Sequence, residues 1–361
     1  GNKLLVMNYI GSKLSLLEFL EESINKVVDK NCNIFCDLFA GTGVVGSYFK
    51  KKGYTVIAND IQYYSFVLNK QYIENHERLK FQKLTKVLPE LKKVEIDERK
   101  DFVCNHLSNL KGINGFIFKN YCLGGTKNQE FQRQYFSDEN GKRCDAIRTQ
   151  IEKWKEEKLI TNSEYYFLLA TLIETIDKRA NTASVYGAFL KQIKKTAQTH
   201  FILKPAELII NDQEHQVYNE DINELANKVE GDILYLDPPY NHRQYATNYH
   251  LLETVAKYDN PKIHGKTGLR EYENQKSLYC SRTKAKKAFE DLILSARTKY
   301  IFLSYNNEGL MTLGDIKEIM SLRGKYGYFT KEYSRFKADK DENRNYKADK
   351  TLEYLHYVVC A

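Results

Sequence analysis

The chain has 361 residues, of which 28% are charged and 42% hydrophobic, and its formal net charge is +8 at pH 7. This length exceeds what one hydrophobic core usually holds, so we expect two domains or one domain with an insertion. No apolar run approaches the roughly 20 residues that a membrane-spanning helix needs, so we expect no membrane partner. The basic excess is compatible with a polyanionic partner.

Cysteine spacing argues against a metal site. Seven cysteines occur, none of them in a C-x-x-C pair, and Cys32 and Cys36 have no histidine cluster nearby. The sequence therefore predicts no bound zinc or other metal. An odd cysteine count without a secretory signal is typical of a reducing compartment, so we expect a cytoplasmic protein.

The N-terminal part predicts a strand–helix–strand unit. After a helix over 14–28, the pattern predicts a strand over 33–39, a tight turn at 40–43, a helix over 44–52 and a strand over 55–58. Two strands joined by one helix form a parallel pair with a right-handed crossover. This unit indicates an α/β, Rossmann-like fold.

The pattern changes after about residue 75. Up to about residue 200 it is charged, aromatic and mostly helical, with helices expected over 143–158 and 159–176 after a polar loop at 123–141. Because no strand–helix alternation occurs here, we predict an inserted helical domain at 76–200, flanked by catalytic-domain segments at 1–75 and 201–361.

Strand patterns return after residue 200. Short apolar runs at 208–210, 233–236 and 300–305 predict further strands. Two alternating runs at 327–333 and 352–359, separated by a charged loop, predict a C-terminal antiparallel hairpin. The catalytic part should thus be a three-layer α/β/α domain with a mixed sheet.

One turn carries most of the chemical information. Asp237-Pro238-Pro239-Tyr240 directly follows the apolar run 233–236, so it should lie at the ligand-binding edge of the sheet. Proline fixes the turn and has no N–H, which leaves a carboxylate and a backbone carbonyl as two aimed acceptors beside an aromatic ring. Such a set suits the exocyclic amine of a planar base. A simple helix cap is the alternative for an Asp-Pro pair alone.

A glycine turn predicts a second ligand site. Gly41-x-Gly43-x-x-Gly46 follows the first strand, and Asp60 ends the second strand, where an acid can hold ribose hydroxyls. These features fit either a dinucleotide or S-adenosylmethionine. Asp37, just before the turn, favours the second, because it would repel a pyrophosphate and attract an ammonium or sulfonium. A helix cap remains the alternative role for Asp37.

These motifs resemble those of DNA adenine-N6 methyltransferases. The resemblance lies in Asp37-Leu38-Phe39-Ala40-Gly41-Thr42-Gly43, in the turn at 237–240 and in residues 8–13. Their order is that of the family's alpha arrangement, in which the insertion reads the DNA sequence. Segments 240–253 and 304–309 are similar to the methyltransferases that accompany type IIS restriction enzymes of the FokI kind.

The resemblance implies roles for individual residues. Catalytic roles fall on Asp237, Pro238, Pro239 and Tyr240. Cofactor-binding roles fall on Tyr9, Lys13, Asp37, Phe39, Gly41, Thr42, Gly43, Asp60, Ile61, Asp221, Ile222 and Asp237. A simple helix cap is the competing interpretation of Asp221.

The implied activity is transfer of a methyl group from S-adenosyl-L-methionine to N6 of an adenine flipped out of double-stranded DNA. Grouped basic residues near the predicted site suggest phosphate contacts, although a single basic loop residue is usually only solvated. The candidates are Arg133, Arg143, His242, Arg243, Lys284, Arg335 and Lys337. The resemblance also implies a monomer and a cognate restriction endonuclease.

Three alternatives stay open at the level of sequence. An NAD-dependent oxidoreductase would explain the glycine turn but leave the turn at 237–240 without a role. A methyltransferase acting on cytosine-N4 or on RNA adenine would share the same amine chemistry, although Asp at the first motif position favours adenine by resemblance. A noncatalytic DNA-binding module would require degenerate motifs, and both motifs are intact.

Overall fold

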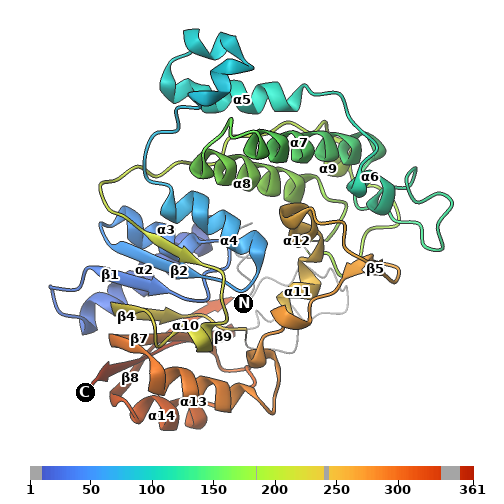
Figure 1. The fold of residues 1–361 in the computed structure, drawn as a ribbon. Coiled ribbons are helices and arrows are strands. Elements are labelled where there is room, and N and C mark those ends of the chain that lie inside the picture. The colour runs from blue at the N-terminus through green and yellow to red at the C-terminus, as the bar shows by residue number, and fades with distance from the viewer. Residues whose placement is uncertain (1–9, 184, 240–243, 335–349) are drawn as a thin grey trace.

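The computed structural model describes residues 10–183, 185–239, 244–334 and 350–361. Within these residues seven strands form one sheet in the order β3-β2-β1-β4-β7-β9-β8, and β5 and β6 form a separate ribbon (Figure 1). The strands are β1 (Ile34–Asp37), β2 (Thr55–Asn59), β3 (Gln216–Tyr218), β4 (Glu230–Leu236), β5 (Ile263–His264), β6 (Leu269–Arg270), β7 (Arg297–Asn306), β8 (Gly324–Ser334) and β9 (Lys350–Cys360).

The sheet is mixed, as predicted. Strands β3, β2, β1, β4 and β7 are parallel, and β9 runs antiparallel between β7 and β8. From β1 the chain moves outward to β2 and β3, and then returns to β4 on the other side of β1. The carboxyl ends of β1 and β4 therefore meet at a topological switch point, where open α/β sheets bind ligands.

Helices cover both faces of the sheet. Phe35 of β1 packs against α2 (Ile10–Val27) and α3 (Val44–Lys51), and its ring stacks on Phe49 at 4.2 Å between centroids. Cys36, the next residue, faces the opposite side with α10 (Ile222–Leu225), α13 (Ala285–Ser295) and α14 (Leu313–Ser321). This confirms the three-layer α/β/α architecture.

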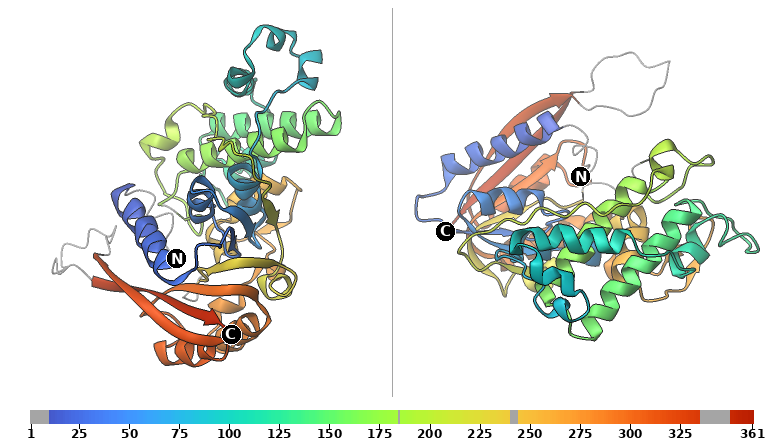
Figure 2. Two further views of the ribbon diagram at one scale, coloured as in Figure 1. Left: turned by 90° about the vertical axis from the view of Figure 1, so that its left-hand side faces the viewer. Right: turned by 90° about the horizontal axis from the view of Figure 1, so that it is seen from above.

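The other helices gather mainly on one side of the sheet, as Figure 2 shows. They are α4 (Tyr63–Asn69), the π-helix η1 (Lys70–Glu74), the 3₁₀ helices η2 (Lys83–Lys86), η3 (Pro89–Lys93) and η4 (Ile96–Glu98), α5 (Arg99–Ser108), α6 (Phe116–Tyr121), α7 (Asp138–Glu156), α8 (Asn162–Arg179), α9 (Lys195–Gln198), α11 (Tyr245–Asn248), α12 (His250–Lys257), and the 3₁₀ helices η5 (Glu273–Gln275) and η6 (Leu278–Cys280). We call residues 76–200 the helical lobe.

The helical lobe does not have a core of its own. Its buried apolar cluster runs from Tyr64 to Ala256, and so includes α4 before the lobe and α12 after it. Strong packing therefore crosses both boundaries that the sequence suggested, at 75/76 and 200/201. The division into an inserted and a catalytic domain stays a prediction.

Arg148 is the main polar tie between α7 and α12. Its side chain is 1% exposed. It donates from Nε to the Val255 carbonyl at 2.9 Å and from NH2 to the Ala256 carbonyl at 3.0 Å, and NH1 lies 3.0 Å from Glu152 Oε1. The two carbonyls belong to the last turn of α12, where helical carbonyls need outside donors.

One expected strand was wrong, and two expected helices are confirmed with shifted bounds. Residues 208–210 form no strand, and the third parallel strand is β3 at 216–218. Helix α7 begins at Asp138, because Ser137 caps it by accepting from the Asn140 N–H. The glycine at position 141 suggested a loop. It lies inside the helix instead, and it is needed there because the Cβ of any other residue would lie 2.2 Å from Cys122 Sγ. Helix α8 begins at Asn162, after a capping box formed by Thr161 and Glu164.

In the described part of the chain, no helix is both long enough and apolar enough to span a bilayer.

Replacing Arg148 by Met should lower the free energy of unfolding by about 3 kcal/mol, because two helix-end carbonyls lose their buried donor and Glu152 loses its ion-pair partner. Urea unfolding followed by circular dichroism measures this. Lys153→Met is the matched control, since Lys153 lies on the same helix with its side chain 64% exposed. Equal stability of the two variants would contradict the role of Arg148.

Candidate active site

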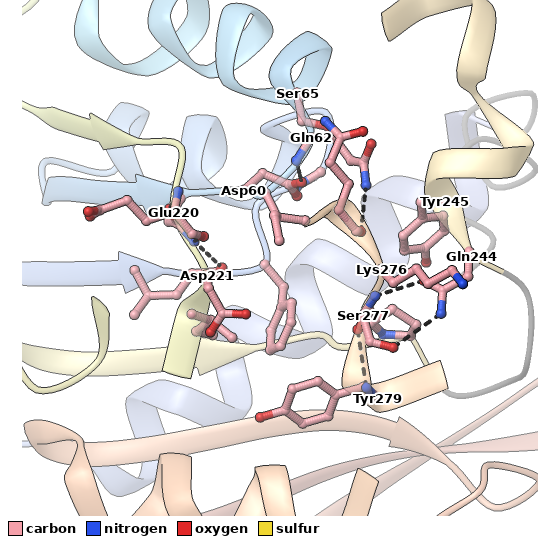
Figure 3. A pocket seen from close by; sticks show the side chains of 18 of the residues that line it. Asp60, Gln62, Ser65, Glu220, Asp221, Gln244, Tyr245, Lys276, Ser277 and Tyr279 are labelled. Carbon is pink, nitrogen blue, oxygen red and sulfur yellow. Dashed lines mark hydrogen bonds between the residues drawn. The ribbon is translucent and has the colours of Figure 1, made fainter. Parts of the chain in front are cut away.

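An open cavity lies at the carboxyl ends of β1, β2, β3 and β4 (Figure 3). Both predicted motifs contribute to it, as the switch point requires. The predicted residues that line it are Phe39, Gly41, Thr42, Asp60, Ile61, Asp221, Ile222, Asp237 and Pro239. Asp37 is completely buried at the end of β1, and neither it nor Gly43 is among the lining residues.

The glycine turn is fixed against the end of β2. The Ala40 N–H donates to the Asn59 carbonyl at 2.9 Å, and the Gly41 N–H donates to Asp60 Oδ2 at 2.8 Å. Gly43 has a φ of 85°, and a Cβ there would lie 2.9 Å from Asn69 Oδ1. The turn is thus held in one conformation, with Gly41 and Thr42 facing the cavity.

The Asp60 carboxylate holds both the glycine turn and the start of α4. While Oδ2 accepts from Gly41, Oδ1 accepts from the Gln62 N–H at 2.9 Å. A carboxylate has about four lone-pair sites. Asp60 can therefore hold the turn and also accept from hydroxyl groups of a ligand, as predicted for a ribose.

Asp221 is a helix cap in this structure. Its Oδ1 accepts from the N–H groups of Asn223 at 2.9 Å and Glu224 at 3.3 Å, at the start of α10. Within the described residues no hydrogen bond to Oδ2 is present, and the side chain lines the cavity. The capping role and a ligand role are therefore compatible.

The cavity is acidic. Among the described residues, four acids line it, namely Asp60, Glu220, Asp221 and Asp237, against one cation, Lys276. Lys276 is exposed, and its Nζ lies 2.8 Å from Glu273 Oε1, a contact that raises the pKa of Lys276. A positively charged ligand is favoured here, and a pyrophosphate is disfavoured.

Two residues that line this cavity each have a buried polar atom without a partner in the described part of the chain. These atoms are Thr42 Oγ1 and Gln62 Oε1, and the Gln62 side chain is 3% exposed. Buried polar groups are normally hydrogen-bonded, so such atoms indicate a missing ligand. No group of three or more His, Cys, Asp or Glu suited to a metal occurs among the described residues.

Residues 237–239 close one side of the cavity. Asp237 and Pro239 line it, and Pro238 and Pro239 are buried. Below them, Tyr235 OH and Ser304 Oγ are 2.7 Å apart. Burial, with a smaller contribution from the Asp237 charge, raises the pKa of Tyr235 well above its usual value. Tyr240 lies outside the described residues.

Comparison with known proteins identifies the family. The family model for D12 class N6 adenine-specific DNA methyltransferases matches residues 9–319. The chain belongs to this family. It is thus an adenine-N6 DNA methyltransferase, as the resemblance implied.

Relatives support the assignment along the whole chain. Type II methyltransferase M.NlaIII of Neisseria lactamica is 52% identical over 98% of this chain and 99% of its own length. Type II methyltransferase M.FokI of Planomicrobium okeanokoites is 40% identical over 98% of this chain and 52% of its own length. Type II methyltransferase M.CviAII of Paramecium bursaria Chlorella virus 1 is 35% identical over 98% of both chains. The predicted resemblance to enzymes of the FokI kind is confirmed.

Several lining residues of the methyltransferase escaped sequence analysis. Gln244 and Ser277 clamp two loops together: the Ser277 N–H donates to Gln244 Oε1 at 2.8 Å, and Gln244 Nε2 donates to the Ser277 carbonyl at 3.2 Å. The buried Tyr279 meets Phe39 edge-on at 5.2 Å. No local pattern distinguishes residues 275–279, whereas Gln62 could have been found from its proximity to Asp60.

The structure corrects one predicted DNA contact of the methyltransferase. Arg133 is 5% exposed, and its guanidinium donates to the carbonyls of Lys266 at 3.2 Å, Asn120 at 3.1 Å and Gly265 at 2.8 Å. These internal acceptors leave the Arg133 side chain unavailable to a phosphate. Arg143 donates to the Ser108 carbonyl and lies 3.6 Å from the exposed Glu139, so a phosphate contact by Arg143 stays a prediction.

The remaining predicted contacts of the methyltransferase are of two kinds. Lys284 is exposed just before α13, so a phosphate contact by this residue stays a prediction. His242, Arg243, Arg335, Lys337 and Tyr9 lie outside the described residues, and so does the side chain of Lys13.

Replacing Gly43 by Ala should destabilise the methyltransferase by about 1 kcal/mol more than Gly53→Ala. Both glycines have positive φ, 85° and 98°, but a Cβ at Gly53 meets nothing within 4 Å. At Gly43 it would displace Asn69, whose Nδ2 donates to the Gly41 carbonyl at 3.0 Å. Chemical denaturation of both variants provides the comparison, and an equal loss of stability would refute the crowding at Asn69.

Proposed function

We propose that this adenine-N6 methyltransferase takes its methyl group from S-adenosyl-L-methionine and acts on an adenine flipped out of double-stranded DNA at a specific sequence. One observation carries the proposal. The glycine turn after β1 and residues 237–239 after β4 open into one cavity, because their strands are neighbours. A methyl donor and an acceptor amine bound at the two turns would therefore be adjacent, so that orientation supplies much of the rate.

The cavity's chemistry suits this cofactor. S-adenosylmethionine, when bound, supplies an activated methyl group on a sulfonium, and it also carries an ammonium. The acids Asp60, Glu220 and Asp221 would attract these charges. The unsatisfied acceptor Gln62 Oε1 and the carboxylate of Asp60 would take the hydrogens of its amine and hydroxyl groups. Phe39 and Ile61 would flank its adenine, while the doubly charged pyrophosphate of NAD would meet the same acids.

The turn at 237–240 would activate the acceptor. The amine lone pair of adenine is conjugated with the ring, so the nitrogen is a poor nucleophile. Hydrogen bonds from the amine to the Asp237 carboxylate and the Pro238 carbonyl would favour a pyramidal nitrogen and stabilise the charge that develops there. Tyr240 would stack on the extruded ring. Extrusion itself costs a few kcal/mol, which contacts to DNA must offset.

We propose that two loops beside the cavity contribute those contacts. Arg133 ties the loop after α6 to the β5–β6 ribbon, and both project on the side of α11 and α12 (Figure 1). The exposed side chains of Lys127, His264 and Lys266 lie on these segments. Arg133 would thus support a basic surface without contacting DNA itself.

The relatives suggest the biological setting. Several are named as type II methyltransferases. Another is named modification methylase StsI, of Streptococcus sanguinis, and is 40% identical over 87% of this chain and 46% of its own length. We therefore propose that this enzyme is the modification component of a restriction-modification system, acting as a cytoplasmic monomer beside a nuclease of the same specificity.

Methylation of a plasmid, followed by single-molecule sequencing that maps modified bases, tests the proposed substrate. We expect N6-methyladenine at every copy of one short sequence and no modified cytosine. Modification of RNA but not duplex DNA, or of adenines irrespective of sequence, would contradict the proposal.

Replacing Asp237 by Ala should lower kcat by at least about a thousandfold, because a developing positive charge loses its acceptor. The Kd for S-adenosylmethionine, measured by calorimetry, should change only slightly. Asp232→Ala is the matched control: Asp232 lies on the same strand at the opposite edge of the sheet, where it accepts from the Asn33 and Ile34 N–H groups. Normal turnover by the Asp237 variant would remove the catalytic assignment.

A further inference from the structure

Glu253 is a buried carboxylate of α12 that lies outside the cavity but bonds to two segments that form it. Its side chain is 1% exposed. Oε2 accepts from the Tyr63 N–H at 2.9 Å, Oε1 accepts from the Tyr64 N–H at 2.7 Å, and Gln275 Nε2 also donates to Oε2. Neither the motifs nor the family comparison assigns a role to this residue.

The first segment that Glu253 holds is the start of α4. This helix follows Asp60 and Gln62 directly, and its residues Tyr64 and Ser65 line the cavity. The first N–H groups of a helix have no partner within the helix, and they carry partial positive charge. A buried carboxylate there fixes both the position and the direction of the first turn, and so the place of Gln62.

The second segment is the loop that includes η5. Gln275 lines the cavity, and its carbonyl accepts from Gln62 Nε2 at 3.4 Å. Because a carbonyl can only accept, this contact orients the Gln62 amide and leaves Oε1 for another donor. Lys276 and Ser277, which follow directly, also line the cavity (Figure 3). One carboxylate therefore joins two walls that come from distant parts of the sequence.

The donor set explains why the residue is an acid. Three N–H donors converge on two oxygens, whereas glutamine would turn its own NH₂ group toward at least one of them. Lys257 Nζ lies 3.7 Å from Oε2 and offsets part of the buried charge. Loss of one acceptor should therefore shift α4 or the loop at 273–280.

We propose that Glu253 is a positioning residue for S-adenosylmethionine: it sets the distance between the α4 wall and the Gln275 wall and so presents Gln62 Oε1 to the cofactor. This inference rests on the proposed function, because it requires the cofactor to bind in this cavity. Since Arg148 holds the last turn of the same helix, the position of the helical lobe also bears on the cofactor site.

A purely structural role for Glu253 is the alternative, and the chain offers a close match for comparison. Asp145 is also fully buried, and its carboxylate accepts from the N–H groups of Ile117 and Phe118, both at 2.9 Å, in the first turn of α6. Tyr258 OH is its third donor, at 2.6 Å. The two carboxylates thus make the same type of cap, but no partner of Asp145 lines the cavity.

The experiment compares Glu253→Gln with Asp145→Asn in the full-length enzyme. Both variants should lose similar thermal stability. Only Glu253→Gln should raise the Kd for S-adenosylmethionine, by about tenfold, as expected for loss of a buried charge-assisted bond. Its KM for the cofactor should rise in parallel, while kcat at saturating cofactor stays within about threefold. Equal affinities in the two variants would overturn the inference.

Gln275→Ala provides a second measurement if Glu253→Gln does not fold, because it keeps the α4 cap. It should raise the Kd by about threefold or more. When both variants fold, the double variant should bind no more weakly than Glu253→Gln alone, since the two side chains act through one contact. Unchanged affinity of Gln275→Ala, or fully additive losses, would overturn the inference. A wild-type enzyme that does not bind the cofactor would instead refute the proposed function, and the inference with it.

Discussion

The site depends on the pairing of β1 with β4. These strands lie far apart in the sequence, but Asp37 is in register with Tyr235, so the residues that follow them emerge side by side. Pairing at a switch point leaves an opening, because the crossover helices leave in opposite directions. In the proposed function the glycine turn and the turn at 237–240 need this opening, since a methyl donor and an acceptor amine have to meet within bonding distance.

The rest of the cavity consists of polar side chains that fix loops. Asp60 holds the glycine turn, Asp221 caps α10, Gln244 clamps the loop at Ser277, and Glu253 caps α4. Each uses a side-chain oxygen to satisfy backbone N–H groups that would otherwise be exposed to the ligand or buried without a partner. The cavity is thus shaped before a ligand enters, which reduces the entropy lost on binding.

Sequence analysis predicted the parts that local pattern specifies. The βαβ unit, the apolar strand before Asp237 and the C-terminal hairpin all have short-range periodicity, and all were confirmed. Residues such as Gln275 were missed because their position depends on contacts from distant segments. Arg133 was misjudged for a related reason: sequence shows its charge, but its burial follows from loop packing that no spacing reveals. Gly141 was misinterpreted for the same reason: it leaves room for the side chain of Cys122, a contact that the sequence does not show.

The core that runs from α4 through the helical lobe to α12 constrains how new sequence specificities can arise in this family. An excised lobe would expose the apolar faces that now pack on α4 and α12, helices that flank the two reactive turns. If the lobe reads the DNA sequence, as the family resemblance implies, wholesale exchange of the lobe between relatives would therefore disturb the chemistry along with the recognition. New sequence specificities should evolve instead by substitutions in surface loops, while the buried core shared by α4, the helical lobe and α12 is kept unchanged.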